Sequence, residues 1–418
     1  MSPKPPTSSD KPAVSPTRWG VVALVILAGV VSAGHAGKAP PALPDIRAEF
    51  TIGLVLGGLV ISIFSITGFF LAPLAGSIGD RLGPRKIVLA GLGLTALGSI
   101  AGAFAGGETF LLVSRIIEGL GYTAIAVSAP AVIARAASGH DRRLALGIWG
   151  AYMPAGAALM MVLAPLMLSR VGWRGLWLLA GLLSLIWWLA TARGTRVIAG
   201  QGAAAKHSSP PFWRHLGGSL GRVLGCPGPW LLALTFASYT MAFVPVFSWL
   251  PTFLIEQRGL GIGLAATLTA LMVGVNAPGN ILAGWLLRHG AAHWALVAIA
   301  GLVMGVCAWL FMSSTLGDGA RYGLVVVFSF VGGLLPAAVL SAAPIFAPSA
   351  DEIGTTNGML VQGANTGLFV APPLAGAIVA AHGGDWDSLR SYMAIAAGAM
   401  LLFALLIRGM EGSAAAGE

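Results

Sequence analysis

The sequence predicts an all-α membrane protein whose twelve transmembrane helices form two pseudo-symmetric bundles of six. Three observations lead to this fold class. Hydrophobic residues make up 56% of the 418 residues and charged residues only 9%, whereas soluble domains carry about 25% charged residues. Glycine, which lets membrane helices approach closely, occurs 59 times. Apolar runs long enough to cross a bilayer recur along the whole chain.

The apolar runs fall in two groups of six, separated by one polar interval. A membrane-spanning helix needs about twenty mostly apolar residues. The predicted spans are 19–43, 51–76, 87–105, 109–132, 144–168 and 174–191, followed by 228–250, 262–287, 294–313, 322–346, 355–380 and 390–407. We therefore expect a disordered cytoplasmic tail over 1–17, a first bundle over 18–192, a cytoplasmic linker over 193–226, a second bundle over 227–408 and a cytoplasmic tail over 409–418.

The distribution of lysine and arginine predicts which side of the membrane each loop faces. With the N-terminus inside, the inward-facing segments hold 16 of the 24 basic residues and the outward-facing loops hold six. Cytoplasmic loops of membrane proteins carry such an excess. We expect a multi-pass protein of the cell (inner) membrane with both termini in the cytoplasm. The net charge of +9 lies in these short clusters, so we expect membrane lipid and no nucleic acid as a partner.

Several other classes of protein lack support in the sequence. Cys226 and Cys307 lie far apart and form neither a metal-binding spacing nor a disulfide framework. There is no phosphate-binding loop of the Walker type, which argues against ATP as the direct energy source. The spans hold no pair of aspartates and no Ser–His pair for intramembrane catalysis. We expect no enzyme activity, no metal and no cofactor. We also expect a monomer to suffice, because six-plus-six proteins complete a pathway without a partner.

The loop after the second predicted span is rich in glycine and charge. Its sequence is Gly76-Ser77-Ile78-Gly79-Asp80-Arg81-Leu82-Gly83-Pro84-Arg85-Lys86. The glycines permit close helix approach and a chain reversal, and Asp80 can pair with a cation or a helix N-terminus. The loop resembles the signature of the major facilitator superfamily. That resemblance implies a gating latch made of Gly76, Gly79, Asp80, Arg81, Gly83, Arg85 and Lys86; a solvated charged loop is the alternative.

The fourth span supports the same resemblance. Its segment Arg115-Ile116-Ile117-Glu118-Gly119-Leu120-Gly121-Tyr122 is similar to the superfamily's helix-four pattern of an arginine followed by a glycine pair. The stretch that continues through Gly147-Ile148-Trp149-Gly150 resembles the cyanate-permease-like branch, whose members import small anions or related solutes. The second half holds only an eroded counterpart of the latch at residues 284–290. The fifth span lacks the Gly-Pro step typical of drug–proton antiporters.

Three charged side chains lie within predicted spans, where each costs about 2.5–3.5 kcal/mol on insertion scales. They are Lys38, Arg115 and Glu118. Counted from the predicted span ends, Lys38 and Arg115 lie about 9 Å inside the external boundary. The simplest pairing joins Arg115 to Glu118, three residues apart on one helix face, and leaves Lys38 without a partner. His35 lies one turn deeper than Lys38 on the same face.

An uncompensated cation in a cavity predicts an anion site. In the superfamily, helices one and four line the central cavity, so the resemblance implies that Lys38, His35 and Arg115 bind one solute. The alternatives are snorkelling of Lys38 to the outer interface and a purely structural Arg115–Glu118 pair. Further candidate solute ligands are the polar residues of predicted cavity helices: Tyr122, Tyr152, Tyr239, Asn276, Gln362 and Asn365. Their alternative role is to join helices by hydrogen bonds.

These observations predict a secondary active transporter that moves a small anionic solute by alternating access. If transport is proton-coupled symport, Glu118 or His35 carries the proton, because each can change charge in a buried site. On this hypothesis the anion weakens the Arg115–Glu118 pair, and Glu118 then takes up a proton. The alternative is an exporter of amphipathic drugs or metabolites, against which an essential Lys38 would count.

Overall fold

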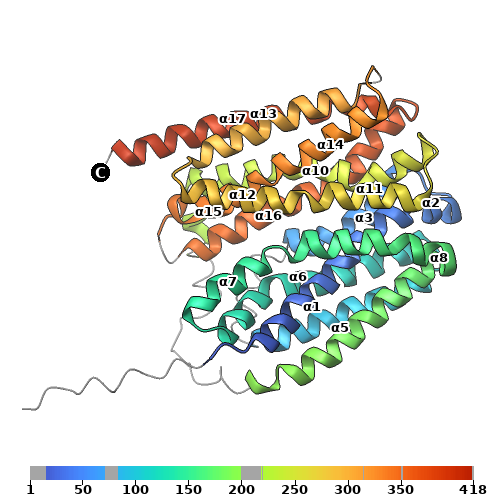
Figure 1. The fold of residues 1–418 in the computed structure, drawn as a ribbon, viewed down its shortest axis with the longest axis horizontal. Helices are drawn as coiled ribbons and strands as arrows, with labels where there is room; N and C mark the ends of the chain where they lie inside the picture. The colour runs from blue at the N-terminus through green and yellow to red at the C-terminus, as the bar shows by residue number, and fades with distance from the viewer. Residues whose placement is uncertain are drawn as a thin grey trace, which may run out of the picture.

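The computed structural model describes residues 16–70, 83–198, 218, 220–313, 315–349 and 352–416. In these residues all regular secondary structure is helical. Figure 1 shows long, roughly parallel helices in two groups, one from each half of the chain. Gly76, Gly79, Asp80 and Arg81 of the predicted latch lie outside the described residues, as do residues 1–15 of the predicted tail and most of the predicted linker.

The first half forms one group of helices. They are α1 (Trp19–Gly37), α2 (Ala39–Phe50), α3 (Leu54–Ser62), η1 (Ile63–Ser65), α5 (Pro84–Ala103), α6 (Glu108–Ala136), α7 (Gly139–Trp149), α8 (Tyr152–Gly194) and η2 (Arg196–Ile198). Within α8 the backbone leaves helical geometry at Gly172, with φ 64° and ψ −177°. Glycine adopts this conformation readily because it lacks a Cβ atom. The fifth and sixth predicted spans therefore meet at Gly172.

The second half repeats this arrangement. Its helices are α10 (Pro227–Glu256), α11 (Ile262–Gly274), α12 (Asn276–Arg288), α13 (His293–Phe311), α14 (Asp318–Gly332), α15 (Leu334–Phe346), α16 (Ile353–Ala381), η4 (Trp386–Ser388) and α17 (Leu389–Ala416). The pairs α11/α12 and α14/α15 each form one predicted span with a short break, at Val275 and Gly333.

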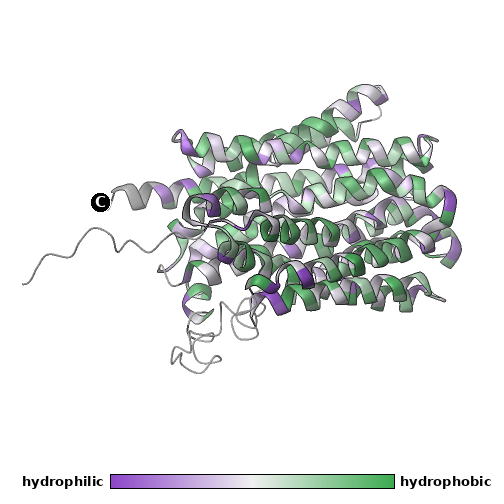
Figure 2. Cartoon of the chain, turned by 60° about the horizontal axis from the view of Figure 1, so that its bottom comes forward, coloured by the Kyte–Doolittle hydropathy of each residue, from purple (hydrophilic) through white to green (hydrophobic). Residues whose placement is uncertain are grey.

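The predicted all-α membrane fold is confirmed. Ten helical segments among the described residues are long and apolar enough to cross a membrane. One of them, Leu144–Gly194, is 51 residues long and contains the break at Gly172, and Leu54–Phe70 is a further, shorter apolar helix. In Figure 2 hydrophobic residues cover the helix flanks, and hydrophilic residues gather toward the two ends of the bundle. The chain is a multi-pass membrane protein.

One predicted boundary is wrong. The first span was expected to end at residue 43, but the helix resumes as α2 and continues to Phe50. Pro40 and Pro41 do not end it, because they lie in the first turn of α2, where a missing N–H group costs no hydrogen bond. Over the predicted cytoplasmic tail, residues 409–418, α17 continues to Ala416, and the place of this segment outside the membrane stays a prediction.

The two halves pack together toward one end of the molecule. We call the end that holds the start of α1 and the last turns of α17 the termini end (Figure 1). At the opposite end a buried cluster combines both halves and includes Leu43, Trp177, Trp249 and Val379. Near the termini end, among the described residues, one buried cluster belongs to the first half alone and another to the second half alone. The halves are therefore joined mainly away from the termini.

Candidate functional site

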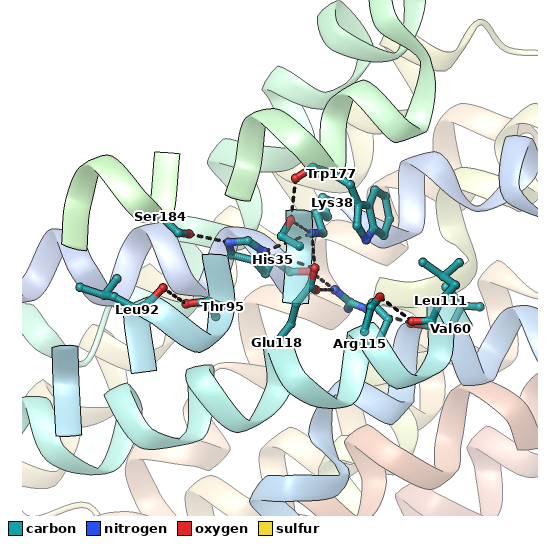
Figure 3. A network of polar contacts seen from close by, with 12 residues as sticks. His35, Lys38, Val60, Leu92, Thr95, Leu111, Arg115, Glu118, Trp177 and Ser184 are labelled. Carbon is teal, nitrogen blue, oxygen red and sulfur yellow. Dashed lines mark hydrogen bonds and ion pairs between the residues drawn. The ribbon is translucent and has the colours of Figure 1, made fainter. Parts of the chain in front are cut away.

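Four titratable side chains meet inside the first bundle (Figure 3). His35 lies in the last turn of α1, and Lys38 is the single residue between α1 and α2. Arg115 and Glu118 lie on α6, one turn apart. All four residues have 0% of their surface exposed. Burial of ionic groups is costly, so such a cluster requires close internal pairing.

The ammonium group of Lys38 has three partners. Its Nζ donates to Glu118 Oε1 at 2.7 Å and to Ser99 Oγ at 2.7 Å, and it lies 3.1 Å from His35 Nδ1. A lysine ammonium has three N–H donors, so all three are used. The expectation that Lys38 lacks a partner is wrong. Spacing along α6 pointed Glu118 only toward Arg115, whereas the packing of α1 against α6 gives the carboxylate a second cation.

The position of Lys38 also differs from the expected one. Because the helix continues to Phe50, Lys38 lies twelve residues, or about 18 Å, before its end rather than near an outer boundary. Its side chain is directed into the bundle, with Nζ 4.4 Å from the ring centroid of Trp177. In this structure, therefore, the Lys38 side chain does not snorkel to the outer interface.

The contacts of His35 determine its tautomer. An ammonium group can only donate, so His35 Nδ1 accepts from Lys38. His35 Nε2 lies 2.8 Å from Ser184 Oγ on α8, and it is the nitrogen that carries the proton and donates. His35 is therefore a neutral imidazole that links Lys38 to α8.

The Arg115 guanidinium makes three hydrogen bonds, and one of its terminal nitrogens makes none within the described residues. Its Nη1 donates to Glu118 Oε2, as the sequence predicted, and to the His35 carbonyl at 2.8 Å. Its Nε donates to the Val60 carbonyl at 3.1 Å. Nη2 is buried and has no hydrogen-bond partner among the described residues. The guanidinium carbon lies 4.7 Å from the ring centroid of Phe64.

The cluster has an excess of positive charge. Lys38 and Arg115 each carry one positive charge, Glu118 carries one negative charge, and His35 is neutral in the tautomer above. Each carboxylate oxygen of Glu118 accepts from one cation. The carboxylate therefore holds two cations together and neutralises one of them.

A small cavity lies between the two halves, with a volume of about 30 Å³. It is lined by Ala36, Ile61, Phe64, Ser65, Tyr122 and Met153 from the first half and by Val244, Phe247 and Leu368 from the second. A space of this size accommodates about one water molecule. Phe64 lines the cavity and also covers the Arg115 guanidinium. The charged cluster therefore lies one side-chain layer behind the surface between the halves.

The other predicted solute ligands are distributed over both halves. The hydroxyl groups of Tyr122 and Tyr152 are 3.1 Å apart and join α6 to α8, and Tyr122 lines the cavity. Asn276 Nδ2 donates to the hydroxyl of Tyr239 at 3.1 Å and joins α12 to α10. These four residues form bonds between helices.

Two predicted ligands lie on α16. Asn365 Nδ2 donates to the Val361 carbonyl of its own helix at 2.9 Å, and its side chain lies against Gly68 of the first half. Gln362 is half-buried on the same helix. A role for these residues as solute ligands stays a prediction.

The sequence did not single out Phe64, Ser99, Trp177 and Ser184, although each contacts the cluster or covers it. Each is an isolated serine or aromatic residue within an apolar span, and such residues occur throughout the chain. Only the packing of η1, α5 and α8 against α1 and α6 distinguishes them.

The described part of the predicted latch packs within the first bundle. Gly83 has φ 87°, which agrees with the predicted chain reversal. Arg85 donates through Nε to Thr195 Oγ1 at 2.9 Å and through Nη2 to the Ala192 carbonyl at 2.8 Å. A cation is favourable at such a helix C-terminus. Lys86 is exposed, and the gating role of these residues stays a prediction.

Comparison with known proteins identifies related chains. The family model of the Major Facilitator Superfamily matches residues 24–361. The probable sulfoacetate transporter of Cupriavidus necator is 25% identical over 81% of this chain and 82% of its own length. The hexuronate transporter of Bacillus subtilis is 22% identical over 92% of each chain. A bacterial homologue of the human lysosomal transporter spinster, in an inward-facing and unoccupied conformation, has the same fold, with a TM-score of 0.78, 16% identity, and coverage of 94% of this chain and 96% of its own.

Proposed function

Because this chain belongs to the major facilitator superfamily, we propose that it is a secondary transporter that carries a small organic anion by alternating access. The observation that carries this proposal is the buried cluster of the first bundle. It holds two cations against one carboxylate, and Arg115 Nη2 keeps an unused donor behind Phe64. A buried guanidinium with an unused N–H group favours an anionic partner, because charge-assisted hydrogen bonds are the strong ones.

The relatives support an anionic solute. Sulfoacetate and hexuronates are small, highly polar organic acids that are ionised at neutral pH, and the two transporters named for them resemble this chain over most of its length. An exporter of amphipathic drugs, the alternative, would be expected to present an apolar cavity without a buried cation. The cluster around Lys38 and Arg115 counts against that alternative.

The packing of the halves supports a cycle between two states. The buried cluster shared by both halves lies at the end opposite the termini. With both termini in the cytoplasm of the cell, as the distribution of lysine and arginine favours, this state is closed toward the outside. Rocking of one bundle against the other would then open the outer side around a site near the middle of the membrane.

Access to Arg115 requires Phe64 to move. The cavity of about 30 Å³ is too small for an organic acid, and the Phe64 ring separates it from the guanidinium. In the loaded state the anion accepts from Arg115 Nη2 and competes with Glu118 for the guanidinium. The carboxylate of Glu118 is then held mainly by Lys38 and takes up a proton. This step couples anion entry to proton entry.

Uptake of labelled organic acids into proteoliposomes tests the proposal. We expect saturable uptake of a small carboxylate or sulfonate by the wild type. Arg115→Gln should lower uptake by about tenfold or more, because a charge-assisted hydrogen bond to the solute is lost. Arg193→Gln is the matched control, since this exposed arginine at the end of α8 lies outside the cluster.

Either of two results would contradict the proposal. One is uptake of lipophilic cations with no response to any organic anion, which would favour the exporter. The other is unchanged anion uptake by Arg115→Gln, which would mean that residues other than Arg115 bind the solute.

A further inference from the structure

A second cavity, of about 330 Å³, lies inside the second bundle. Helices α10, α11, α13, α14 and α17 surround it near their ends opposite the termini (Figure 1). Its wall is mainly apolar and includes Trp249, Phe253, Leu268, Phe311, Val325 and Leu389. Protein interiors contain few voids larger than a water molecule. This volume instead falls in the range of about 300–1,000 Å³ that small-molecule sites occupy.

Charged residues gather at one side of this cavity. Arg258, Asp318 and Arg321 line it, and Arg258 Nε pairs with Asp318 Oδ1 at 3.0 Å. All three lie at or near the ends of α10 and α14, whereas Val325 lies one turn deeper along α14. The cavity therefore combines a charged outer part with an apolar interior.

Arg321 retains unused donors. Its residue is 8% exposed, and its Nε donates to the Phe311 carbonyl at 2.6 Å. Its Nη2 forms an ion pair with Asp387 Oδ1 at 3.6 Å, a separation longer than that of an N–H···O hydrogen bond. Among the residues that the structure describes, the two terminal nitrogens have no hydrogen-bond partner. A largely buried guanidinium in the wall of a cavity is thus available to an anionic group.

The two bundles carry side chains of different size beside similar arginine contacts. Arg174 donates to the carbonyl just beyond the end of α5 at 2.6 Å, and Arg390 makes the matching bond beyond the end of α13 at 2.8 Å. The residue before each of these arginines differs in size between the two bundles. In the first bundle it is the buried indole of Trp173, and in the second it is Leu389, which lines the cavity. The smaller side chain contributes to the open volume.

We propose that this cavity binds a single-chain amphipathic carboxylate, such as a fatty acid. The carboxylate accepts from Arg321 and Arg258, and the hydrocarbon chain lies between α10 and α14 against the apolar wall. Guanidinium groups suit carboxylates because they can donate two parallel hydrogen bonds. The volume is near the lower end of the range for ligand sites, which favours one chain over the two of a phospholipid. The site is separate from the space between the halves and does not depend on the proposed transport function.

Binding of radiolabelled laurate tests this inference. The full chain is placed in nanodiscs of phosphatidylcholine, with empty nanodiscs as the background. We expect saturable binding to the wild type. Arg321→Gln should weaken it by about tenfold or more through loss of a charge-assisted hydrogen bond. Leu389→Trp should abolish it, because the larger indole would occupy the cavity that Leu389 lines.

Matched controls separate the site from general effects. Leu402→Trp places the same side chain at an exposed position of α17 and should bind laurate as the wild type does. Arg258→Gln changes a more exposed arginine and should also weaken laurate binding. This variant provides the test of the charged part of the site if Arg321→Gln fails to fold. Dodecanol, which has the chain without the carboxylate, should compete poorly.

Three outcomes would overturn the inference. The first is laurate binding no greater than that of empty nanodiscs. The second is wild-type binding by both Arg321→Gln and Leu389→Trp. The third is saturable binding of labelled lysophosphatidylglycerol together with no binding of laurate. This result would identify a lysophospholipid, and not a fatty acid, as the occupant of the cavity.

Discussion

At the scale of single residues, the buried cluster depends on one carboxylate. Glu118 accepts from Lys38 through one oxygen and from Arg115 through the other. The remaining partners, His35 and Ser99, are neutral and orient Lys38. Removal of one partner from a buried ionic network leaves an uncompensated charge. The protonation state of Glu118 therefore controls both the stability of the cluster and how strongly Arg115 attracts an anion.

Glu118→Gln should both destabilise the protein and change its pH dependence. With the carboxylate gone, two cations face each other in the bundle interior, and we expect a loss of about 3–5 kcal/mol in the free energy of unfolding. Thermal or denaturant unfolding in detergent measures this loss. If Glu118 is the proton carrier, the variant should also lose the stimulation of uptake by an acidic outside. Full pH-dependent uptake by Glu118→Gln would exclude that role.

A double variant separates these two effects. Lys38→Met combined with Glu118→Gln keeps Arg115 as the single buried charge, which equals the charge excess of the wild-type cluster. Stability should recover in part, by the coupling expected for residues in direct contact, while acid-stimulated uptake stays absent. Glu108→Gln, in the first turn of the same helix, serves as the control for both measurements.

At the scale of helices, glycine allows the spans to pack closely enough to hold the cluster and join the halves. A Cβ atom at Gly58 of α3 would lie 2.6 Å from the backbone nitrogen of Pro373 on α16. A Cβ atom at Gly91 of α5 would lie 2.7 Å from the carbonyl oxygen of Gly121 on α6. Membrane helices associate largely by such packing, since lipid provides no hydrophobic drive between them. The abundance of glycine thus has a specific structural cause at these contacts.

Replacement of glycine by alanine should have opposite effects on stability at two positions of α16. A Cβ atom at Gly363 would lie 2.9 Å from the backbone carbonyl carbon of Ala233, so Gly363→Ala should cost about 1–3 kcal/mol by overpacking. At Gly354 no atom lies within 4 Å of the added Cβ, and Gly354→Ala should be neutral or stabilising by up to about 1 kcal/mol. Thermal unfolding compares the two. Equal tolerance at both sites would mean that α10 and α16 separate easily.

At the scale of the whole molecule, an ion pair joins the halves at the end opposite the termini. Arg47 Nη1 pairs with Glu256 Oε1 at 2.8 Å. Within the second half, Trp249 of the shared buried cluster donates through Nε1 to the Pro372 carbonyl at 3.0 Å and so links α10 to α16. These residues lie in or next to that cluster. In an alternating-access cycle contacts between the halves have to break and re-form, so their strength sets the balance between the two states.

Reversal of one charge should shift that balance. Arg47→Glu places two carboxylates together where the pair is partly exposed, so the effect should be about 1 kcal/mol, or about fivefold in population. A cysteine at Ser65, which lines the space between the halves, reports opening through its reaction with an impermeant thiol reagent added outside. Cys226 and Cys307 are first replaced by alanine.

The exchange variant Arg47→Glu/Glu256→Arg provides the control. It restores an ion pair of the opposite sense, so the labelling rate of the cysteine at position 65 should return to the wild-type value. Equal labelling rates in Arg47→Glu and the wild type would show that the apolar cluster alone holds this end closed.

The sequence by itself determined the class of fold, the order of the spans and the identity of the unusual charges. These follow from local properties, because a bilayer demands long apolar helices and penalises every charge within them. It also predicted the Arg115–Glu118 pair, since three residues along a helix bring two side chains onto one face.

Only the tertiary structure decided what those charges contact. Lys38 meets Glu118 across 80 positions of sequence, and Ser99 and Ser184 come from two further helices. The cavity of the second bundle likewise combines side chains from α10, α11, α13, α14 and α17. Such contacts are set by how helices pack, which depends on side chains from several spans at once. A local pattern can therefore mark a buried charge but does not determine its partner.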